Sequence, residues 1–381
     1  MTIAFLSHLD LNLYLFRLPM MQELVKQGHK VYAVCPKGDK FDLFAQYGIE
    51  ALAYEIERSS LNPLKELKAI YNIYKAIKPL KLDMLHTFTA KPNIYGTLAG
   101  KMAKVPTIIN LVEGLGSFYI EDTKKNVLVR TIIEKLYRFV FYFSDKVVFV
   151  NTDDPAYLES KRVISKNKIK IIKSVGIDTQ EFDSQKIEEE VLEDLKEALD
   201  LKNKIVVLMV ARAIWHKGIR EYYEASSLLS SKKNIQFILV GDIDEGNPSS
   251  ASKAFLEDGN VLWLGHRNDI FMLTALSDIY VLPSYREGVP RTLLEAASMA
   301  KPIITTDTIG CREVVEDGVN GYLVPIKDAH ALAKKIEYLV SHKEERKVMG
   351  ENGRIMAIKE FDIKNVVRQY MTLYKELEKG K

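Results

Sequence analysis

Two carboxylates with seven residues between them, Glu287 and Glu295, flank a predicted strand-to-helix loop. The apolar run 279–283 before them is typical of a buried parallel strand, and Pro290 suits the first turn of a helix, where no N–H is needed. The start of such a helix binds anions, while carboxylates accept hydrogen bonds from sugar hydroxyls. The segment therefore predicts a nucleotide-sugar site; the alternative is a capped helix with a solvated face. The residues expected at this site are Glu287, Gly288, Val289, Pro290 and Glu295.

Two cations, Arg212 and Lys217, follow the apolar run 205–210, which predicts another buried strand. Parallel strands end at one edge of a sheet, so both cations are expected beside the Glu287 loop. Two fixed cations there suit a diphosphate and stabilise its charge as it departs. Taken singly, each cation is more typical of a solvated surface.

A third turn, at Gly265, His266 and Arg267, follows the predicted strand 260–264. Glycine lets a backbone approach a ligand closely, so this turn is expected to read a base edge, with Arg267 stacked or paired nearby. The alternative for His266 is an ordinary solvated loop histidine.

In the first half of the chain, Glu113 follows the predicted strand 107–111 and is succeeded by Gly114 and Gly116. These glycines do not fit the dinucleotide fingerprint G-x-G-x-x-G. A carboxylate beside glycines at the end of a strand is a candidate for contacting a reacting group. The alternative is an ordinary loop acid.

Three more residues of the first half are candidates for holding an acceptor. Lys91 and His86 stand where the strand 82–86 joins a helix, and Arg17 lies near the cleft edge of the first strand. The two cations suit an anionic acceptor, and His86 could orient it. The alternative for His86 is a histidine satisfied at the end of its strand.

Short apolar runs alternate with helical patterns throughout, which predicts an α/β protein with doubly wound parallel sheets. The predicted strands of the first half are 2–7, 30–35, 50–54, 82–86, 107–111 and 146–150. Those of the second series are 169–172, 204–210, 235–240, 260–264, 278–282, 302–305 and 321–324. The predicted helices are 16–27, 63–78, 92–103, 126–143, 217–230, 291–300, 311–316, 328–340 and 362–378.

A chain of 381 residues exceeds what one core usually supports, so two domains are expected. We expect an acceptor-binding domain over 1–178 and a nucleotide-sugar domain over 179–361, facing each other across a cleft that holds the ligand. The last segment, 362–381, is expected to form a helix that crosses back to the first domain.

Charge is distributed unevenly along the chain. Residues 1–180 hold 26 Lys and Arg against 18 Asp and Glu, a net charge of +8, whereas the remainder holds 28 against 33, a net charge of −5. A basic half suggests an anionic partner, such as an acidic membrane or a phosphorylated substrate. Nucleic acid is not expected, because no binding module appears. Two distant cysteines and the lack of a basic signal-peptide start indicate a cytoplasmic protein.

The predicted helix 126–143 combines a broad apolar surface with bordering Lys and Arg residues. A basic amphipathic helix of this kind can lie in a membrane interface. The alternative is a core helix with a charged outer face.

No metal and no cofactor are expected. The histidines and cysteines lack zinc-ligand spacing, and the pair Asp242 and Asp244 is a pattern that arises often by chance. Neither a P-loop nor a nucleophile elbow is found.

Together these segments resemble the retaining glycosyltransferases of family 4, which have the GT-B fold of two Rossmann-like domains. The resemblance covers nearly the whole chain and is strongest over 205–325. Glu287 and Glu295 match the family's E-x7-E motif, and Arg212 and Lys217 match its basic pair. It implies that Glu287 holds donor-sugar hydroxyls, Glu295 the ribose, and the two cations the diphosphate.

More narrowly, the segments 112–119, 173–177 and 211–218 resemble a branch that acts in bacterial protein N-glycosylation. That branch implies UDP-N-acetylgalactosamine (UDP-GalNAc) as donor and a sugar linked to undecaprenyl diphosphate as acceptor, hence a peripheral position at the cytoplasmic face of the inner membrane. We expect front-face transfer with retention, in which the acceptor hydroxyl attacks from the side on which UDP departs, while Arg212, Lys217 and the helix start stabilise the departing UDP. Many family members have a histidine where this chain has Glu113, so that histidine's role is not carried over, and Glu113 is expected to contact the sugar or the acceptor.

Three other activities fit parts of the same pattern. A UDP-sugar 2-epimerase would bind a related donor without a lipid acceptor. Another transferase of the family would use N-acetylglucosamine or galactose. A non-catalytic sensor would bind UDP and turn nothing over.

Overall fold

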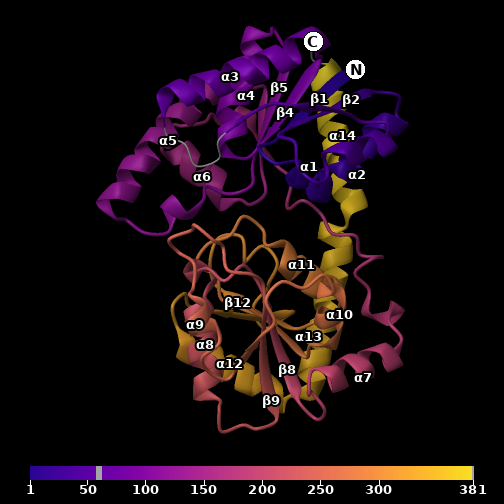
Figure 1. The fold of residues 1–381 in the computed structure, drawn as a ribbon, viewed down its shortest axis with the longest axis vertical. Coiled ribbons are helices and arrows are strands. Elements are labelled where there is room, and N and C mark those ends of the chain that lie inside the picture. Colours follow the sequence, from indigo (N-terminus) through magenta and orange to yellow (C-terminus); the bar gives the residue numbers. More distant parts are fainter. Residues whose placement is uncertain (57–61, 380–381) are drawn as a thin grey trace. The chain divides into compact units, whose positions relative to one another are not determined.

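The computed structural model describes residues 1–56 and 62–379. The chain divides into two compact units, the first made of Met1–Val175 with Lys364–Lys381 and the second of Gly176–Ile363. Each unit is built around one parallel sheet (Figure 1).

The sheet of the first unit has the strand order β3-β2-β1-β4-β5-β6-β7, and each of its strand pairs is parallel. Every residue of its central strands 84–88 and 107–112 is buried, as expected for a sheet covered on both faces. The last strand, grouped with the second series in the sequence, pairs with β6 of this first sheet. The strands are β1 (Thr2–Leu6), β2 (Lys30–Cys35), β3 (Glu50–Ala53), β4 (Met84–Phe88), β5 (Thr107–Val112), β6 (Lys146–Phe149) and β7 (Ile169–Ile171).

The helices of the first unit include one from the far end of the chain, α14, which Figure 1 draws in yellow. It contacts the N-terminal segment, since the Tyr374 hydroxyl lies 3.2 Å from the Met20 sulfur. The α-helices are α1 (Asp10–Phe16), α2 (Leu18–Lys26), α3 (Pro63–Ile77), α4 (Ala90–Met102), α5 (Lys124–Phe143), α6 (Asp153–Ser160) and α14 (Ile363–Lys379). Short 3-10 turns are Phe41–Tyr47, Lys78–Leu80, Ser117–Tyr119 and Lys166–Lys168.

The helix predicted over 16–27 is found as α2, two residues shorter at its start, and the helix α1 that precedes it was not predicted; the two meet at Arg17. Pro19 lies in the first turn of α2 and has no N–H to continue α1 into it. The break leaves Arg17 at the junction, close to the carboxyl end of β1 along the chain.

The sheet of the second unit has the order β10-β9-β8-β11-β12-β13, again parallel. Every strand of this sheet was predicted, within two residues at each end. The strands are β8 (Ile205–Val210), β9 (Ile235–Val240), β10 (Val261–Trp263), β11 (Ile279–Leu282), β12 (Ile303–Thr306) and β13 (Gly321–Val324).

The helices of the second unit were predicted less completely than its strands. The α-helices are α7 (Glu189–Ala198), α8 (Ile219–Leu228), α9 (Lys253–Leu256), α10 (Ile270–Leu276), α11 (Arg291–Ser298), α12 (Ala329–Ser341) and α13 (Lys343–Met356). The 3-10 turns Ser184–Lys186 and Trp215–Lys217 and the π-helical turn Ala357–Phe361 complete the unit. Across both units, the helices α1, α6, α7, α9, α10 and α13 were not predicted from the sequence.

The helix predicted over 311–316 is wrong, since residues 311–314 form only a turn. The side chain of Asn320 donates to the Val314 carbonyl at 2.9 Å and accepts from the Glu316 N–H at 2.8 Å. These backbone groups bind a side chain and do not continue a helix.

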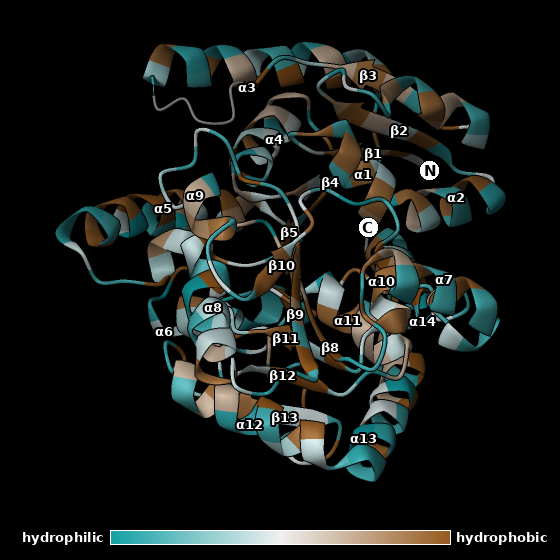
Figure 2. Cartoon of the chain, turned by 60° about the horizontal axis from the view of Figure 1, so that its bottom comes forward, coloured by the Kyte–Doolittle hydropathy of each residue, from teal (hydrophilic) through white to brown (hydrophobic). Residues whose placement is uncertain are grey.

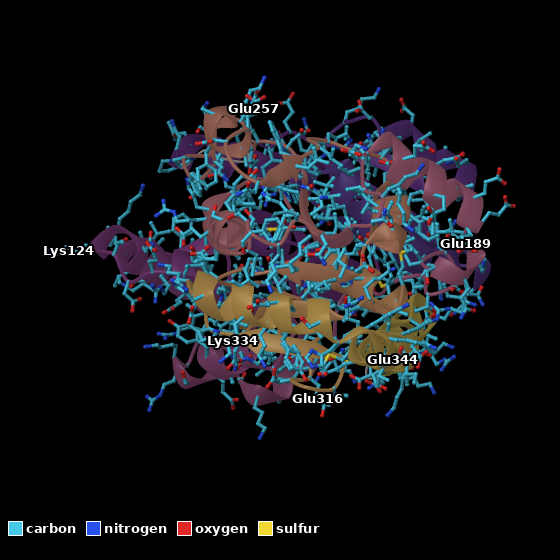
Figure 3. The ribbon with its side chains drawn as sticks, turned by 90° about the horizontal axis from the view of Figure 1, so that it is seen from below. Lys124, Glu189, Glu257, Glu316, Lys334 and Glu344 are labelled. Carbon is cyan, nitrogen blue, oxygen red and sulfur yellow. The ribbon has the colours of Figure 1, made fainter. Side chains whose placement is uncertain are left out.

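Apolar residues fill the interior of both units, and the central strands are mostly brown in the hydropathy colouring of Figure 2. Charged side chains point outwards from the helices. Figure 3 shows Lys124 of α5, Glu189 of α7 and Glu344 of α13 projecting away from the ribbon. Within the described residues, no helix has the length and apolar character needed to cross a membrane.

Candidate active site

The second unit brings Lys217 and Glu287 together as an ion pair. Lys217 ends the 3-10 turn after β8, and Glu287 lies in the loop between β11 and α11. The Ser284 hydroxyl donates to Glu287 Oε1 at 2.6 Å, so the carboxylate is held from two sides. The side chains of Lys217 and Glu287 are 19% and 12% exposed. The predicted lysine and glutamate therefore meet at the carboxyl edge of the sheet, in a largely desolvated setting where charge interactions are strong.

Two glycines fix the backbone of these loops. Gly218 has a φ of +79°, and a Cβ there would lie 2.1 Å from the Pro283 carbonyl oxygen. Gly310 has a φ of +83°, and a Cβ there would lie 2.3 Å from the Gly288 carbonyl oxygen. Only glycine fits either place without a shift of backbone. Neither glycine was predicted as a site residue, although each lies in the loop after a predicted strand.

Arg212 follows β8 and is paired with Asp244, with 2.6 Å between Nη1 and Oδ2. Asn247 donates to the same carboxylate oxygen at 2.9 Å. Asp244 is thus occupied by an arginine and an amide. Among the described residues, no cluster of three or more His, Cys, Asp or Glu is arranged to hold a metal ion. Arg212 itself is 55% exposed at the end of its strand.

Glu295 lies in the second turn of α11, where Arg291 Nε donates to its Oε1 at 3.0 Å. Its side chain is 12% exposed, and burial raises the pKa of this carboxyl, partly offset by Arg291. Pro290 is the N-cap residue, directly before the first helical residue Arg291, and Gly288 and Val289 lie in the loop before it.

Gly265, His266 and Arg267, in the turn after β10, differ in their exposure and in their hydrogen-bond partners. The Gly265 carbonyl accepts a hydrogen bond of 2.8 Å from the Gly241 N–H, which ties this turn to the one after β9. The His266 side chain is 69% exposed. Arg267 donates to Asp269 at 2.8 Å and lowers the pKa of that carboxyl. Arg267 is therefore already paired within its own loop.

In the first unit, Glu113 follows β5 directly and forms an ion pair with Arg17. Gly114 and Gly116 follow it with φ of 147° and 86°. Glu113 is 27% exposed, whereas Arg17 is 1% exposed. Contrary to the prediction, Arg17 is not open to an acceptor in this structure, because its guanidinium is buried against Glu113.

His86, also expected to contact an acceptor, is fully buried in β4. Its Nδ1 lies 2.7 Å from the hydroxyl of Tyr374, and burial with the nearby Arg17 charge holds its pKa well below the usual value. That expectation is wrong for direct contact: the neutral ring belongs to the core against α14.

Lys91, in α4, is engaged by Glu66, with its Nζ 3.0 Å and 3.2 Å from the two carboxylate oxygens. Both side chains are about one-fifth exposed, at 21% and 18%. An acceptor phosphate would therefore compete with Glu66 for this cation. No pattern in the sequence pointed to the partner residues Ser284, Glu66 and Tyr374.

Comparison with family models finds a match on each unit. Residues 192–356 match the family described as glycosyl transferases group 1, and residues 2–151 match the family described as glycosyl transferase 4-like. The first match contains Arg212, Lys217, Glu287 and Glu295, and the second contains Glu113.

Comparison with individual proteins extends over the whole chain. The chain is 38% identical over 380 residues, all of both chains, to the N,N'-diacetylbacillosaminyl-diphospho-undecaprenol alpha-1,3-N-acetylgalactosaminyltransferase of Campylobacter jejuni. It is 28% identical over 83% of its length, and 81% of the relative's, to the UDP-Gal:alpha-D-GlcNAc-diphosphoundecaprenol alpha-1,3-galactosyltransferase of Escherichia coli. A glycosyltransferase structure from Rickettsia africae superimposes with a TM-score of 0.82 at 24% identity, covering 100% of this chain and 99% of that one. The expected fold is thereby confirmed, and the chain belongs to the family 4 glycosyltransferases of GT-B fold.

Proposed function

We propose that this glycosyltransferase moves N-acetylgalactosamine from UDP-GalNAc to a bacillosamine linked to undecaprenyl diphosphate, forming an α-1,3 bond in protein N-glycan assembly. The full-length identity of 38% to the Campylobacter jejuni enzyme carries this proposal. The Escherichia coli relative, named for a UDP-sugar donor and a diphosphoundecaprenol acceptor, supports the same two substrate classes.

The charged residues of the second unit fit the donor half of this reaction. Lys217 and Arg212 would neutralise the departing diphosphate together with the start of α11. Glu287 would accept hydrogen bonds from the donor sugar and Glu295 from the ribose, with the Gly265 turn beside the base. These protein cations supply the charge that a bound metal would otherwise provide, so we propose that the enzyme needs no metal and no cofactor. Glu113 would contact the sugar or acceptor during front-face transfer with retention.

An acceptor linked to undecaprenyl diphosphate lies at an anionic membrane surface. One face of α5 is suited to bind that surface. Leu128, Ile132, Leu136 and Phe139 follow one another at spacings of three or four residues, so they share one face of the helix. They are 63%, 50%, 41% and 56% exposed. Lys124, Lys125 and Lys135 are exposed on the same helix. We propose that this face docks the enzyme at the cytoplasmic side of the inner membrane, with apolar residues in the interface and lysines on lipid phosphates.

Release of UDP from UDP-GalNAc by the purified protein tests the transfer. The assay is run with and without the lipid-linked bacillosamine, in EDTA, beside UDP-GlcNAc and UDP-Gal. Acceptor-dependent release that survives EDTA and prefers UDP-GalNAc is expected. Preference for another donor would make the enzyme a different transferase of the family. Conversion without acceptor would indicate an epimerase or hydrolase, and UDP binding without turnover of any donor would indicate a sensor.

Sedimentation with lipid vesicles tests the membrane surface separately. Wild type should sediment with vesicles containing an anionic phospholipid, and Ile132→Glu should reduce that binding. Leu64→Glu is the matched control, because Leu64 is 77% exposed on a different helix, α3. Equal loss of binding in both variants, or none in either, would contradict docking through α5.

A further inference from the structure

The contact between Arg17 and Glu113 joins residues 96 positions apart in sequence. Arg17 stands at the junction of α1 and α2, and Glu113 stands at the carboxyl end of β5. The ion pair is asymmetric, since the arginine is 1% exposed and the glutamate 27%. Glu113 therefore keeps contact with solvent while its partner does not.

The guanidinium of Arg17 lies over an aromatic ring, that of Phe88. Its central carbon lies 4.7 Å from the centroid of the Phe88 ring at the end of β4. The ring of Phe88 is in turn 4.3 Å from that of His86, which is hydrogen-bonded to Tyr374 of α14. Stacking on an aromatic face fixes a guanidinium in one plane. The position of Arg17 is thus set by Phe88 of β4, which packs against His86 and, through it, is linked to the C-terminal helix.

Arg17 presents almost none of its guanidinium to an external anion, because its side chain is 1% exposed. Its Nε is buried and has no hydrogen-bond partner among the described residues, and its Nη2 donates to Glu113. An anionic acceptor would have to displace Glu113 or enter the core to reach it. A buried arginine paired with a partly exposed carboxylate is better suited to hold that carboxylate than to bind a substrate.

We propose that Arg17 is a positioning residue: it fixes the carboxylate of Glu113 at the carboxyl edge of the first sheet for the sugar-transfer step, and does not itself bind the acceptor diphosphate. This inference rests on the proposed function, in which Glu113 contacts the sugar or the acceptor. Arg17 acts through Glu113, so its removal matters only while Glu113 is present.

A double-mutant cycle with Arg17→Met and Glu113→Gln tests the proposal by steady-state kinetics of UDP release. Methionine carries no charge but keeps an unbranched side chain against Phe88. Arg17→Met should lower kcat roughly 10- to 100-fold, the scale of a misplaced catalytic group, and leave the KM for the lipid acceptor within about twofold. The double variant should be no slower than Glu113→Gln alone. Arg17→Lys, which keeps a cation for Glu113, should recover part of kcat.

Two results would overturn the proposal. A raised acceptor KM in Arg17→Met, with losses that multiply in the double variant, would show that Arg17 binds the acceptor itself. A kcat unchanged in Arg17→Met would show that Glu113 needs no positioning. Tyr54→Phe is the control for a merely structural effect: it removes a buried hydrogen bond of 2.9 Å to the Ser7 carbonyl, outside the contacts that hold Arg17, and should lower the melting temperature without changing kcat. If wild type transfers no sugar with any donor or acceptor, the proposed function itself has failed, and that outcome is distinct from either of these two.

Discussion

The two sheet edges hold their charged side chains in different ways. In the second unit, Lys217 and Glu287 pair with each other, and both come from loops that directly follow strands. In the first unit, Glu113 follows its strand in the same way, but its partner Arg17 comes from a helix junction and is buried. The second edge is assembled from local strand-to-helix loops, whereas the first depends on packing between distant segments.

This difference separates two kinds of sensitivity to mutation. Mutation of the Lys217–Glu287 pair, which lies in loops supported by Ser284 and by glycine contacts, should lower activity more than stability. A pair that includes a fully buried arginine should affect both, because an isolated buried charge is costly. Substitutions at each edge can show where that contrast fails.

Replacement of Lys217 by alanine should have the largest effect on catalysis. We expect a loss of roughly 100- to 1000-fold in kcat, typical of removing one group that stabilises developing charge on the leaving group. The measurement is kcat and KM for UDP-GalNAc, with Lys232→Ala as control, because the Lys232–Glu337 pair is a surface pair in the same unit, with both side chains 47% exposed. A loss of kcat below about threefold would show that Lys217 takes no part in catalysis. The proposed difference between the two sheet edges would then fail.

Replacement of Glu113 by alanine should destabilise the first unit by about 3 to 5 kcal/mol, the scale observed when one partner of a buried ion pair is removed. Denaturant unfolding measures this. The reciprocal change, Arg17→Met, should cost less, because Glu113 is 27% exposed and remains solvated. Combining Arg17→Met with Glu113→Ala should recover stability but not activity. Equal costs for the two single variants would show that the asymmetry of burial has no energetic consequence.

Most strands of both sheets were predictable from the sequence because they are short, nearly continuous apolar runs, as buried parallel strands are, although the edge strands β3 and β7 are only partly buried. The placement of the candidate residues of the second unit was predictable for a related reason: Arg212, Lys217 and Glu287 lie in loops that follow predicted strands. Helices were predicted less well. The short helix α1 before α2 was not predicted, and at the predicted helix 311–316 the side chain of Asn320 binds backbone groups that a helix would need.

The first unit shows what a local pattern leaves out. Lys91 meets Glu66 across 25 positions, Arg17 meets Glu113 across 96, and His86 meets Tyr374 across 288. Each of these partners is chosen by tertiary packing, so composition and spacing near the residue carry no sign of it. The expected acceptor residues Arg17 and His86 were therefore found buried, Arg17 at a helix junction and His86 in the middle of β4, two residues before its end.

Arg212 provides a smaller and more graded test of the second edge. It is 55% exposed and paired with Asp244, so it is held less firmly than Lys217. Arg212→Ala should raise the KM for the donor about tenfold, an effect of the size of a charge-assisted hydrogen bond. Salt should weaken donor binding in wild type more than in this variant, since an exposed charge is screened. A KM that is unchanged, with equal salt dependence, would confine Arg212 to its pair with Asp244.

The smallest expected effect is a dependence of donor binding on pH that comes from Glu295. Burial raises the pKa of this carboxyl above its ordinary value. For an acid, a raised pKa means that the charged form is lost sooner as pH falls, so Glu295 should become protonated in a range where exposed carboxylates remain charged. A ribose hydroxyl that donates to the carboxylate then loses its best acceptor, and the KM for UDP-GalNAc should rise as the pH is lowered from neutrality. Glu295→Gln should have a higher KM that changes less with pH. Glu257→Gln, at an exposed glutamate of the same unit, should keep the wild-type dependence of KM on pH. If the KM of Glu295→Gln keeps the full pH dependence, another group is responsible for it. Glu295 would then not contribute to donor binding in the second unit.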